Sequence, residues 1–163
     1  MKYLVGSVAI LLSTSLATTS CAQLPHAESV SGQKSTEGSV VIYDKQKERS
    51  CAIRPVVGSD TYRFGKGKTC DGLPNDEAYY FKLDGVPSAV LVTFYDDDDC
   101  DDDKSWHFRV RTLQNPTTLE PMKLREAHDR PNGSIIGPGV KMESKQGDNG
   151  HVDGHLSCVK IEY

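Results

Sequence analysis

Short runs of alternating apolar and polar residues are the feature that most restricts the fold of this chain. Residues 106–111 alternate in this way, and so do residues 122–125 and 159–163. Such alternation is typical of strands with one buried face. Residues 40–43 and 89–95 are apolar runs rich in β-branched and aromatic side chains. Past the N-terminal apolar run, no segment keeps a helical period, so the sequence predicts an all-β sandwich of short antiparallel strands.

The first twenty residues carry the features of an export signal. Lys2 provides a positive start, residues 4–16 are mostly apolar, and small residues follow. This apolar run is short for a membrane span, which favours a signal peptide over residues 1–20. Two cleavage sites compete. Ser20 and Ala22 suit an ordinary signal-peptidase site, whereas Thr19-Ser20-Cys21 resembles the end of a bacterial lipobox, in which Cys21 would carry lipid.

The cysteines are consistent with export. There are five, at positions 21, 51, 70, 100 and 158. If Cys21 is lipidated, or removed with the leader, then Cys51, Cys70, Cys100 and Cys158 are left to form two disulfides in an oxidising compartment. Four cysteines allow three pairings, and the residues alone do not choose between them. Ala22, rather than an acidic residue, follows Cys21; this resembles lipoproteins sorted to the outer membrane, so we expect a periplasm-facing protein anchored there by lipid. Residues 21–39 are rich in serine, threonine, glycine and proline and predict a flexible tether, followed by one domain over residues 40–163.

Most of the negative charge lies in one short segment. The net charge of −4 argues against a nucleic-acid-binding protein. Seven of the 23 acidic residues form one run: Asp96, Asp97, Asp98, Asp99, Asp101, Asp102 and Asp103. This run is either a solvated hairpin tip or a surface that steers a basic partner protein. His107, Arg109 and Arg111 on the next strand could compensate part of its charge.

The two halves of the domain, residues 40–84 and 90–163, share a weak pattern. Each opens with a strand that ends in Tyr-Asp, and each closes with an acidic turn that leads into another strand. This pattern resembles the βγ-crystallin family, whose domains pair two Greek-key motifs in one sandwich. Ser157 matches the serine that pins the hairpin in that family, whereas Tyr79-Tyr80 stands in its place in the first half. The second half is longer by roughly thirty residues, around residues 114–149.

The resemblance has two consequences for the expected structure. It implies that Cys51 pairs with Cys70 inside the first motif, and that Cys100 pairs with Cys158 inside the second. It also implies a calcium site, for which the chain offers only partial matches: Asn75, Asp76, Asp153 and Ser157. Calcium needs many oxygen ligands, so no cofactor is predicted and calcium is kept as an alternative.

The chain contains no motif for a reaction. It has no G-x-S-x-G, H-E-x-x-H or C-x-x-C sequence and no glycine-rich phosphate loop. His151, Asp153 and His155 have the spacing of one face of a strand. Gly150 and Gly154 indicate a loop there instead, so we predict no metal site and no catalytic residues. An enzyme would have to use His128 with Asp129, or His151 with Asp153.

These observations favour a binding protein over an enzyme. Exported lipoproteins of this size include immunity proteins, and some crystallin-like exported proteins inhibit hydrolases. We expect an immunity protein or inhibitor of a toxic hydrolase, such as a phospholipase effector of type VI secretion. The aspartate run would steer the partner, and Tyr79, Tyr80 or Trp106 would anchor it. The alternative is a structural or calcium-binding crystallin-like envelope lipoprotein without a dedicated protein target.

Overall fold

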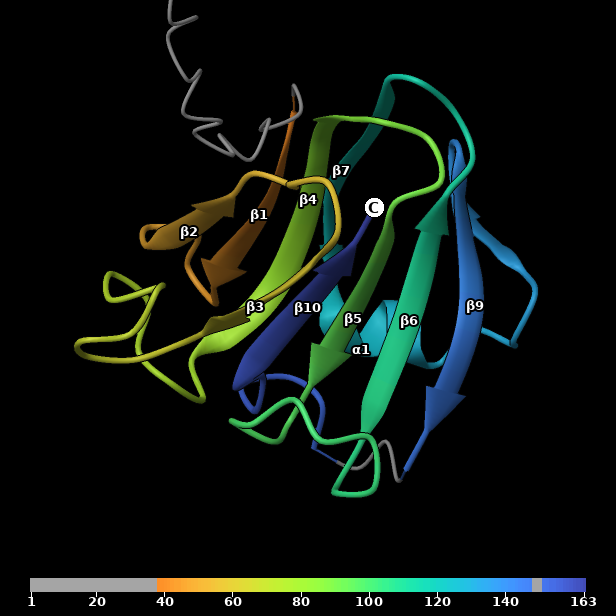
Figure 1. Cartoon of the computed structure of the whole chain (residues 1–163). Helices are drawn as coiled ribbons and strands as arrows, with labels where there is room; N and C mark the ends of the chain where they lie inside the picture. Colours follow the sequence, from red (N-terminus) through yellow and green to blue (C-terminus); the bar gives the residue numbers. More distant parts are fainter. Residues whose placement is uncertain (1–37, 148–150) are drawn as a thin grey trace, which may run out of the picture. The chain divides into compact units, whose positions relative to one another are not determined.

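The computed structural model of the protein describes residues 38–147 and 151–163. These residues form two antiparallel β-sheets and one short helix (Figure 1). The fold is therefore the predicted all-β sandwich. The predicted signal peptide, Cys21 and the tether up to residue 37 lie outside the described residues. The first strand begins at Ser39, one residue before the predicted start of the domain.

One sheet has four strands in the order β2-β1-β4-β7. In β1 every second residue is buried, as its apolar pattern requires, and β1 pairs with β2 on one side and with β4 on the other. The bounds of the four strands are Ser50–Ile53 (β2), Ser39–Asp44 (β1), Ala78–Val86 (β4) and Thr117–Lys123 (β7).

The other sheet has six strands in the order β3-β10-β5-β6-β9-β8. Their bounds are Ser59–Arg63 (β3), Cys158–Glu162 (β10), Leu91–Tyr95 (β5), His107–Thr112 (β6), Val140–Gln146 (β9) and Ile135–Gly137 (β8). Two strands are exchanged between the halves of the chain. β3 leaves the sheet of β1 and β2 to pair with β10, and β7 leaves the sheet of β5 and β6 to pair with β4.

Three phenylalanine rings join the two sheets in the core. Phe81 on β4 lies 4.9 Å from Phe94 on β5, measured between ring centroids, and Phe94 lies 4.7 Å from Phe108 on β6. All three side chains are fully buried. Burial of a large apolar side chain stabilises a fold by about 1.5–3 kcal/mol, so this cluster is a main source of the attraction between the sheets.

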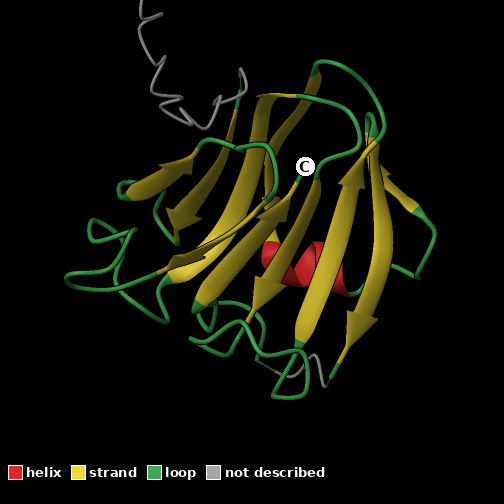
Figure 2. Ribbon diagram, in the orientation of Figure 1, coloured by secondary structure: helices red, strands yellow, loops and turns green. Residues whose placement is uncertain are grey.

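The extra segment of the second half forms a short helix and a hairpin. Residues 122–125 were expected to be strand, but the strand ends at Lys123 and α1 (Leu124–His128) begins. Leu124, Ala127 and His128 share one helical face and are buried, which explains the change. α1 packs on β4 and β7, and Figure 2 shows it behind the six-stranded sheet. The hairpin of β8 and β9 then extends that sheet beyond β6.

Two disulfides connect loops to strands. Cys51 on β2 is bonded to Cys70 in the segment between β3 and β4, and Cys100 is bonded to Cys158 on β10. In both pairs the Cα atoms are 5.5 Å apart, within the ordinary range. These are the two pairs that the crystallin resemblance implied.

Candidate functional site

The aspartate run lies in the connection between β5 and β6, which we call the acidic loop (residues 96–105). Its ends are joined by the backbone N–H of Asp96, which donates to the carbonyl of Trp106 at 3.1 Å. Asp98, Asp99, Asp102 and Asp103 are exposed, while Asp96, Asp97 and Asp101 are half-buried. The loop is therefore a hairpin connection, as the sequence predicted, but part of its charge is turned toward the protein.

Three contacts hold the acidic loop against the outer face of the six-stranded sheet. The Cys100–Cys158 disulfide is the first. In the second, the Tyr95 hydroxyl donates to Asp102 Oδ1 at 2.8 Å, and in the third, Arg63 donates to Asp99 Oδ1 at 3.1 Å. Cys158 is in register with Arg63 on β3 and with Tyr95 on β5. The three anchors thus come from one row across three neighbouring strands.

Tyr95 shows how closely the loop covers this row. Its side chain is buried and packs against the ring of His107 at 5.6 Å. Burial, together with the neighbouring Asp102 carboxylate, raises the pKa of Tyr95 to about 12. The hydroxyl therefore remains a hydrogen-bond donor across the physiological pH range.

Inside the loop, aspartates fix the backbone. Asp97 Oδ1 accepts hydrogen bonds from the N–H groups of Asp99 at 2.9 Å and Asp101 at 3.3 Å, and Asp101 Oδ1 accepts one from Asp103 at 3.0 Å. Lys104 pairs with Asp97 and Asp101 at 3.5 and 3.4 Å. The hydrogen bond from Asp103, followed by Lys104, lowers the pKa of Asp101, and Asp101 in turn raises the pKa of Lys104.

The negative charge of the acidic loop is not compensated by Arg109 and Arg111 on β6, although the sequence suggested these two arginines. Arg109 lies 3.9 Å from Glu162, and Arg111 lies 3.3 Å from Glu143. Both arginines belong to an ion-paired outer face of the sheet. Arg63 and Lys104 compensate the acidic loop instead. Lys104 could have been found in the sequence, because it directly follows the run, whereas Arg63 is distant along the chain.

The predicted aromatic anchors lie on another part of the molecule. Tyr79 and Tyr80 are half-buried on β4, in the four-stranded sheet. Amines cover their rings: Lys45 Nζ lies 5.7 Å from the centre of Tyr79, and Lys47 Nζ lies 4.5 Å from the centre of Tyr80. Trp106 is only 3 % exposed, so its expected role as a surface anchor is wrong. It belongs to the core.

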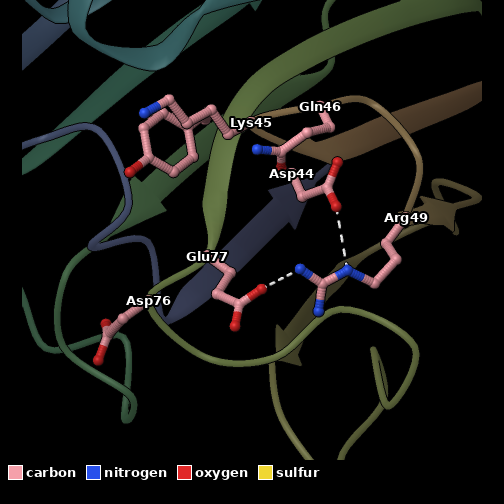
Figure 3. Close-up of a pocket in the computed structure, with 7 residues that line it drawn as sticks. Asp44, Lys45, Gln46, Arg49, Asp76 and Glu77 are labelled. Carbon is pink, nitrogen blue, oxygen red and sulfur yellow. Dashed lines mark hydrogen bonds and ion pairs between the residues drawn. The ribbon is translucent and has the colours of Figure 1, made fainter.

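A cavity of about 200 Å³ lies beside Tyr79. In it, Arg49 pairs with Asp44 at 3.0 Å and with Glu77 (Figure 3). Asp76 borders the same cavity, but its carboxylate points away from the Arg49–Glu77 pair (Figure 3). Polar and charged residues line the cavity, and three of the charged ones, Asp44, Arg49 and Glu77, are paired with one another.

The two histidine–aspartate pairs considered for catalysis, His151 with Asp153 and His128 with Asp129, are placed differently in the fold: His151 is exposed and His128 is buried. Asp153 is engaged elsewhere, because its Oδ1 accepts a hydrogen bond from the backbone N–H of Arg125 at 3.2 Å. His128, with Asp129 at 4.0 Å from its Nδ1, is 1 % exposed and faces the rings of Trp106 and Phe108. His128 is therefore a core residue with no access to a substrate.

Some of the residues expected for calcium do meet. The Ser157 hydroxyl lies 3.4 Å from Asp76 Oδ1, across 81 positions of sequence. One carboxylate oxygen of Asp76, one of Asp96 and one ring nitrogen of His155 lie within 4.8 Å of one another. We call these three residues the His155 cluster. Asp96 joins the cluster only through the fold, since nothing in its sequence position relates it to Asp76 or His155.

No family model, curated protein or solved structure matches the chain. Among the described residues, no helix has the length and apolar composition needed to cross a membrane.

Proposed function

We propose that this chain is a periplasm-facing lipoprotein that binds and neutralises a partner protein. The partner class that fits best is a toxic hydrolase, such as a phospholipase effector of type VI secretion, and the chain would be its immunity protein or inhibitor. The observation that carries the proposal is the acidic loop: it is tied down at three points, yet it leaves Asp98, Asp99, Asp102 and Asp103 exposed.

A loop that is already ordered is well suited to binding. Association is weakened when flexible segments must be fixed, and a preformed surface avoids much of that loss. A concentrated negative surface also speeds the approach of a basic partner and disfavours acidic ones. The acidic loop combines both properties, so we assign it the central role in recognition, with Tyr79 and Tyr80 as secondary contacts.

The proposed location depends on the chemistry of the cysteines. Two disulfides are typical of oxidising compartments such as the periplasm. Lipid attachment at Cys21 and an outer-membrane position complete the proposal, because an anchored inhibitor would meet an incoming toxin at the membrane. A role without catalysis is part of the same proposal.

Capture from periplasmic extract tests this function. The immobilised protein is incubated with extract at about 50 mM and about 500 mM salt, and any captured protein is identified and assayed for hydrolase activity with and without the chain. Exposed charges are screened strongly at the higher salt. We expect capture of a basic hydrolase at low salt, weaker capture at high salt, and inhibition of its activity.

A charge-matched pair of variants locates the surface. Changing Asp98, Asp99, Asp102 and Asp103 to asparagine removes four charges, keeps one acceptor oxygen at each position for the bonds from Tyr95 and Arg63, and should reduce capture about tenfold or more. The control removes four exposed charges elsewhere: Glu48→Gln, Asp84→Asn, Glu120→Gln and Glu126→Gln. Equal loss in both variants, or no captured hydrolase at low salt, contradicts the proposal.

We also propose that the sandwich consists of two Greek-key motifs of the βγ-crystallin type. The exchanged strands support this: β3 of the first half lies in the sheet of the second, and β7 of the second half lies in the sheet of the first. On this view α1 and the β8–β9 hairpin are an insertion after the third strand of the second motif.

A second candidate function is a structural envelope lipoprotein stabilised by a bound cation, with calcium as the ion that the family resemblance implied. The contact between Ser157 and Asp76 favours it, because it joins the ends of the two halves where a cation could bind. A melting temperature that rises with the cation, with no hydrolase captured at either salt concentration, would support this candidate over the first.

A further inference from the structure

We propose that Asp76, Asp96 and His155 form a binding site for one divalent transition-metal ion, with Zn²⁺ as the natural probe. The site goes beyond the protein-binding function proposed above. Its three donor atoms, two carboxylate oxygens and one imidazole nitrogen, lie within 4.8 Å of one another. A tetrahedral zinc ion with bonds of about 2.0–2.1 Å holds its ligands about 3.4 Å apart, so modest side-chain rotations would close the site.

The three ligands come from segments that the fold holds together. Asp76 precedes β4, Asp96 follows β5, and His155 precedes β10. The N–H of Gly154 donates to the carbonyl of Ala78 at 2.9 Å, and the N–H of Ser157 donates to the carbonyl of Tyr95 at 2.9 Å. His155 therefore lies on a stretch of backbone that is bonded to the chain beside both aspartates. The site is largely formed before an ion arrives.

The charge of the His155 cluster is uncompensated. Within residues 38–147 and 151–163, no lysine or arginine forms an ion pair with Asp76 or Asp96, although most of the acidic residues around them are paired. Asp76 and Asp96 interact instead with the hydroxyls of Ser157 and Ser105. Two neighbouring carboxylates repel each other, and a divalent cation between them would reverse that repulsion.

The nitrogen donor of His155 indicates which metal ions the cluster would bind. Calcium and magnesium prefer oxygen ligands only, and calcium needs six to eight of them. Nitrogen together with carboxylate oxygens suits Zn²⁺ and its neighbours in the first transition row. Asp153 Oδ1 accepts a hydrogen bond from Arg125, and even with the Ser157 hydroxyl beside Asp76 the cluster offers fewer oxygens than calcium needs. The second exposed histidine, His151, lies 5.7 Å from His155 between ring centroids, and it provides a control for the test.

Calorimetric titration of the metal-free, full-length protein with Zn²⁺ tests the site. We expect one binding step with a dissociation constant below about 10 μM, unaffected by about 1 mM Ca²⁺. Saturating zinc should raise the melting temperature by several degrees, about 4 °C or more, because the ion binds the folded chain only.

Variants assign the step to these residues. His155→Ala and Asp96→Asn should each weaken the zinc affinity about 30-fold or more and abolish the rise in melting temperature. His155 is exposed and Asp96 is half-buried, so without zinc the variants should melt within about 2 °C of the parent protein. His151→Ala removes a neighbouring exposed imidazole and should change the affinity by less than about threefold.

Several results would overturn the assignment. A zinc step that persists in His155→Ala places the ion elsewhere in the chain. An equal loss in His151→Ala assigns it to the two histidines rather than to the cluster. Displacement of zinc by Ca²⁺, or affinity weaker than about 10 μM, shows that the cluster is not a transition-metal site. None of these outcomes bears on hydrolase capture, so the two proposals fail separately.

Discussion

At position 128, an imidazole occupies a place in the core that a hydrocarbon could fill. His128 faces the rings of Trp106 and Phe108 at 6.1 and 5.9 Å between centroids. Burial, and after it the positive charge of Lys145, lowers the pKa of His128. In the unfolded chain a histidine titrates near pH 6.5. As the pH falls through that value, the unfolded state takes up a proton that the folded state resists, so the free energy of unfolding decreases.

His128→Leu should remove this part of the pH dependence. We expect the fall in unfolding free energy between pH 7.5 and pH 5.5 to be smaller in the variant than in the parent protein, because leucine does not titrate. Urea denaturation at several pH values measures the difference. His151→Ala, at an exposed position, should retain the parental slope. An identical slope in His128→Leu would show that His128 does not couple protonation to folding.

At the scale of elements, the acidic loop owes its order to its attachment to β10. The Cys100–Cys158 disulfide closes a segment with a sequence separation of 58, against 19 for Cys51–Cys70. On the chain-entropy model, the longer closure stabilises the fold by about 4 kcal/mol and the shorter one by about 3 kcal/mol, with measured values often lower. The two disulfides therefore contribute similar free energies but fix different segments: Cys100–Cys158 attaches the acidic loop to β10, whereas Cys51–Cys70 attaches the β3–β4 connection to β2.

Removing each bridge separates these two effects. The double change Cys100→Ala and Cys158→Ala should lower the unfolding free energy by about 2–4 kcal/mol and accelerate amide hydrogen exchange in the acidic loop. Cys51→Ala with Cys70→Ala should destabilise by a similar amount but leave exchange in that loop unchanged. Denaturant titration and hydrogen-exchange mass spectrometry give the two readouts. Unaltered exchange after loss of Cys100–Cys158 would mean that Tyr95 and Arg63 suffice to order the loop.

The elements also show how far a sequence of this kind can be interpreted. The alternation of residues 106–111 predicted β6, because each side chain lies on one of two faces. Alternation is absent from β3, which is short, polar and at a sheet edge, so that strand was missed. Residues 140–143 do alternate between buried and half-buried side chains, but they lie within the predicted insertion, so β9 was missed. α1 has five residues, too few for a helical period to be recognised.

The candidate sites depended on contacts that only the folded chain brings about. The aspartate run was evident from composition, since seven charges stand together in the sequence. Its anchoring was not, because Arg63 and Cys158 meet the loop only through strand register. The same holds for the His155 cluster, whose members lie far apart along the chain. Groups of residues that are adjacent in the sequence could therefore be predicted, whereas contacts between segments that are distant in the sequence could not.

At the scale of the whole sandwich, the exchange of β3 and β7 makes the halves depend on each other. A fragment of residues 38–87 would leave β3 without β10, and a fragment of residues 88–163 would leave β7 without β4. Each would also expose its share of the phenylalanine core. Unpaired strands and exposed apolar surface are unfavourable in water.

Separate expression of these two fragments should therefore give chains that do not unfold cooperatively. Mixing them at equal concentration, with the disulfides allowed to form, should restore the near-ultraviolet circular dichroism of the intact domain. Titration with urea before and after mixing measures the recovery. Cooperative unfolding by either fragment alone would show that the exchanged strand is dispensable.

The position of β10 has a consequence for the order of events during biosynthesis. β10 is inserted between β3 and β5, although it is the last of the described strands to be made. Until residues 158–162 have been made, both neighbours keep an open edge on this side and Cys100 lacks its partner Cys158. The larger sheet can therefore be completed only after synthesis has passed this point. A prematurely terminated chain would expose the unpaired Cys100 thiol and the open edges of β3 and β5 to cellular quality control.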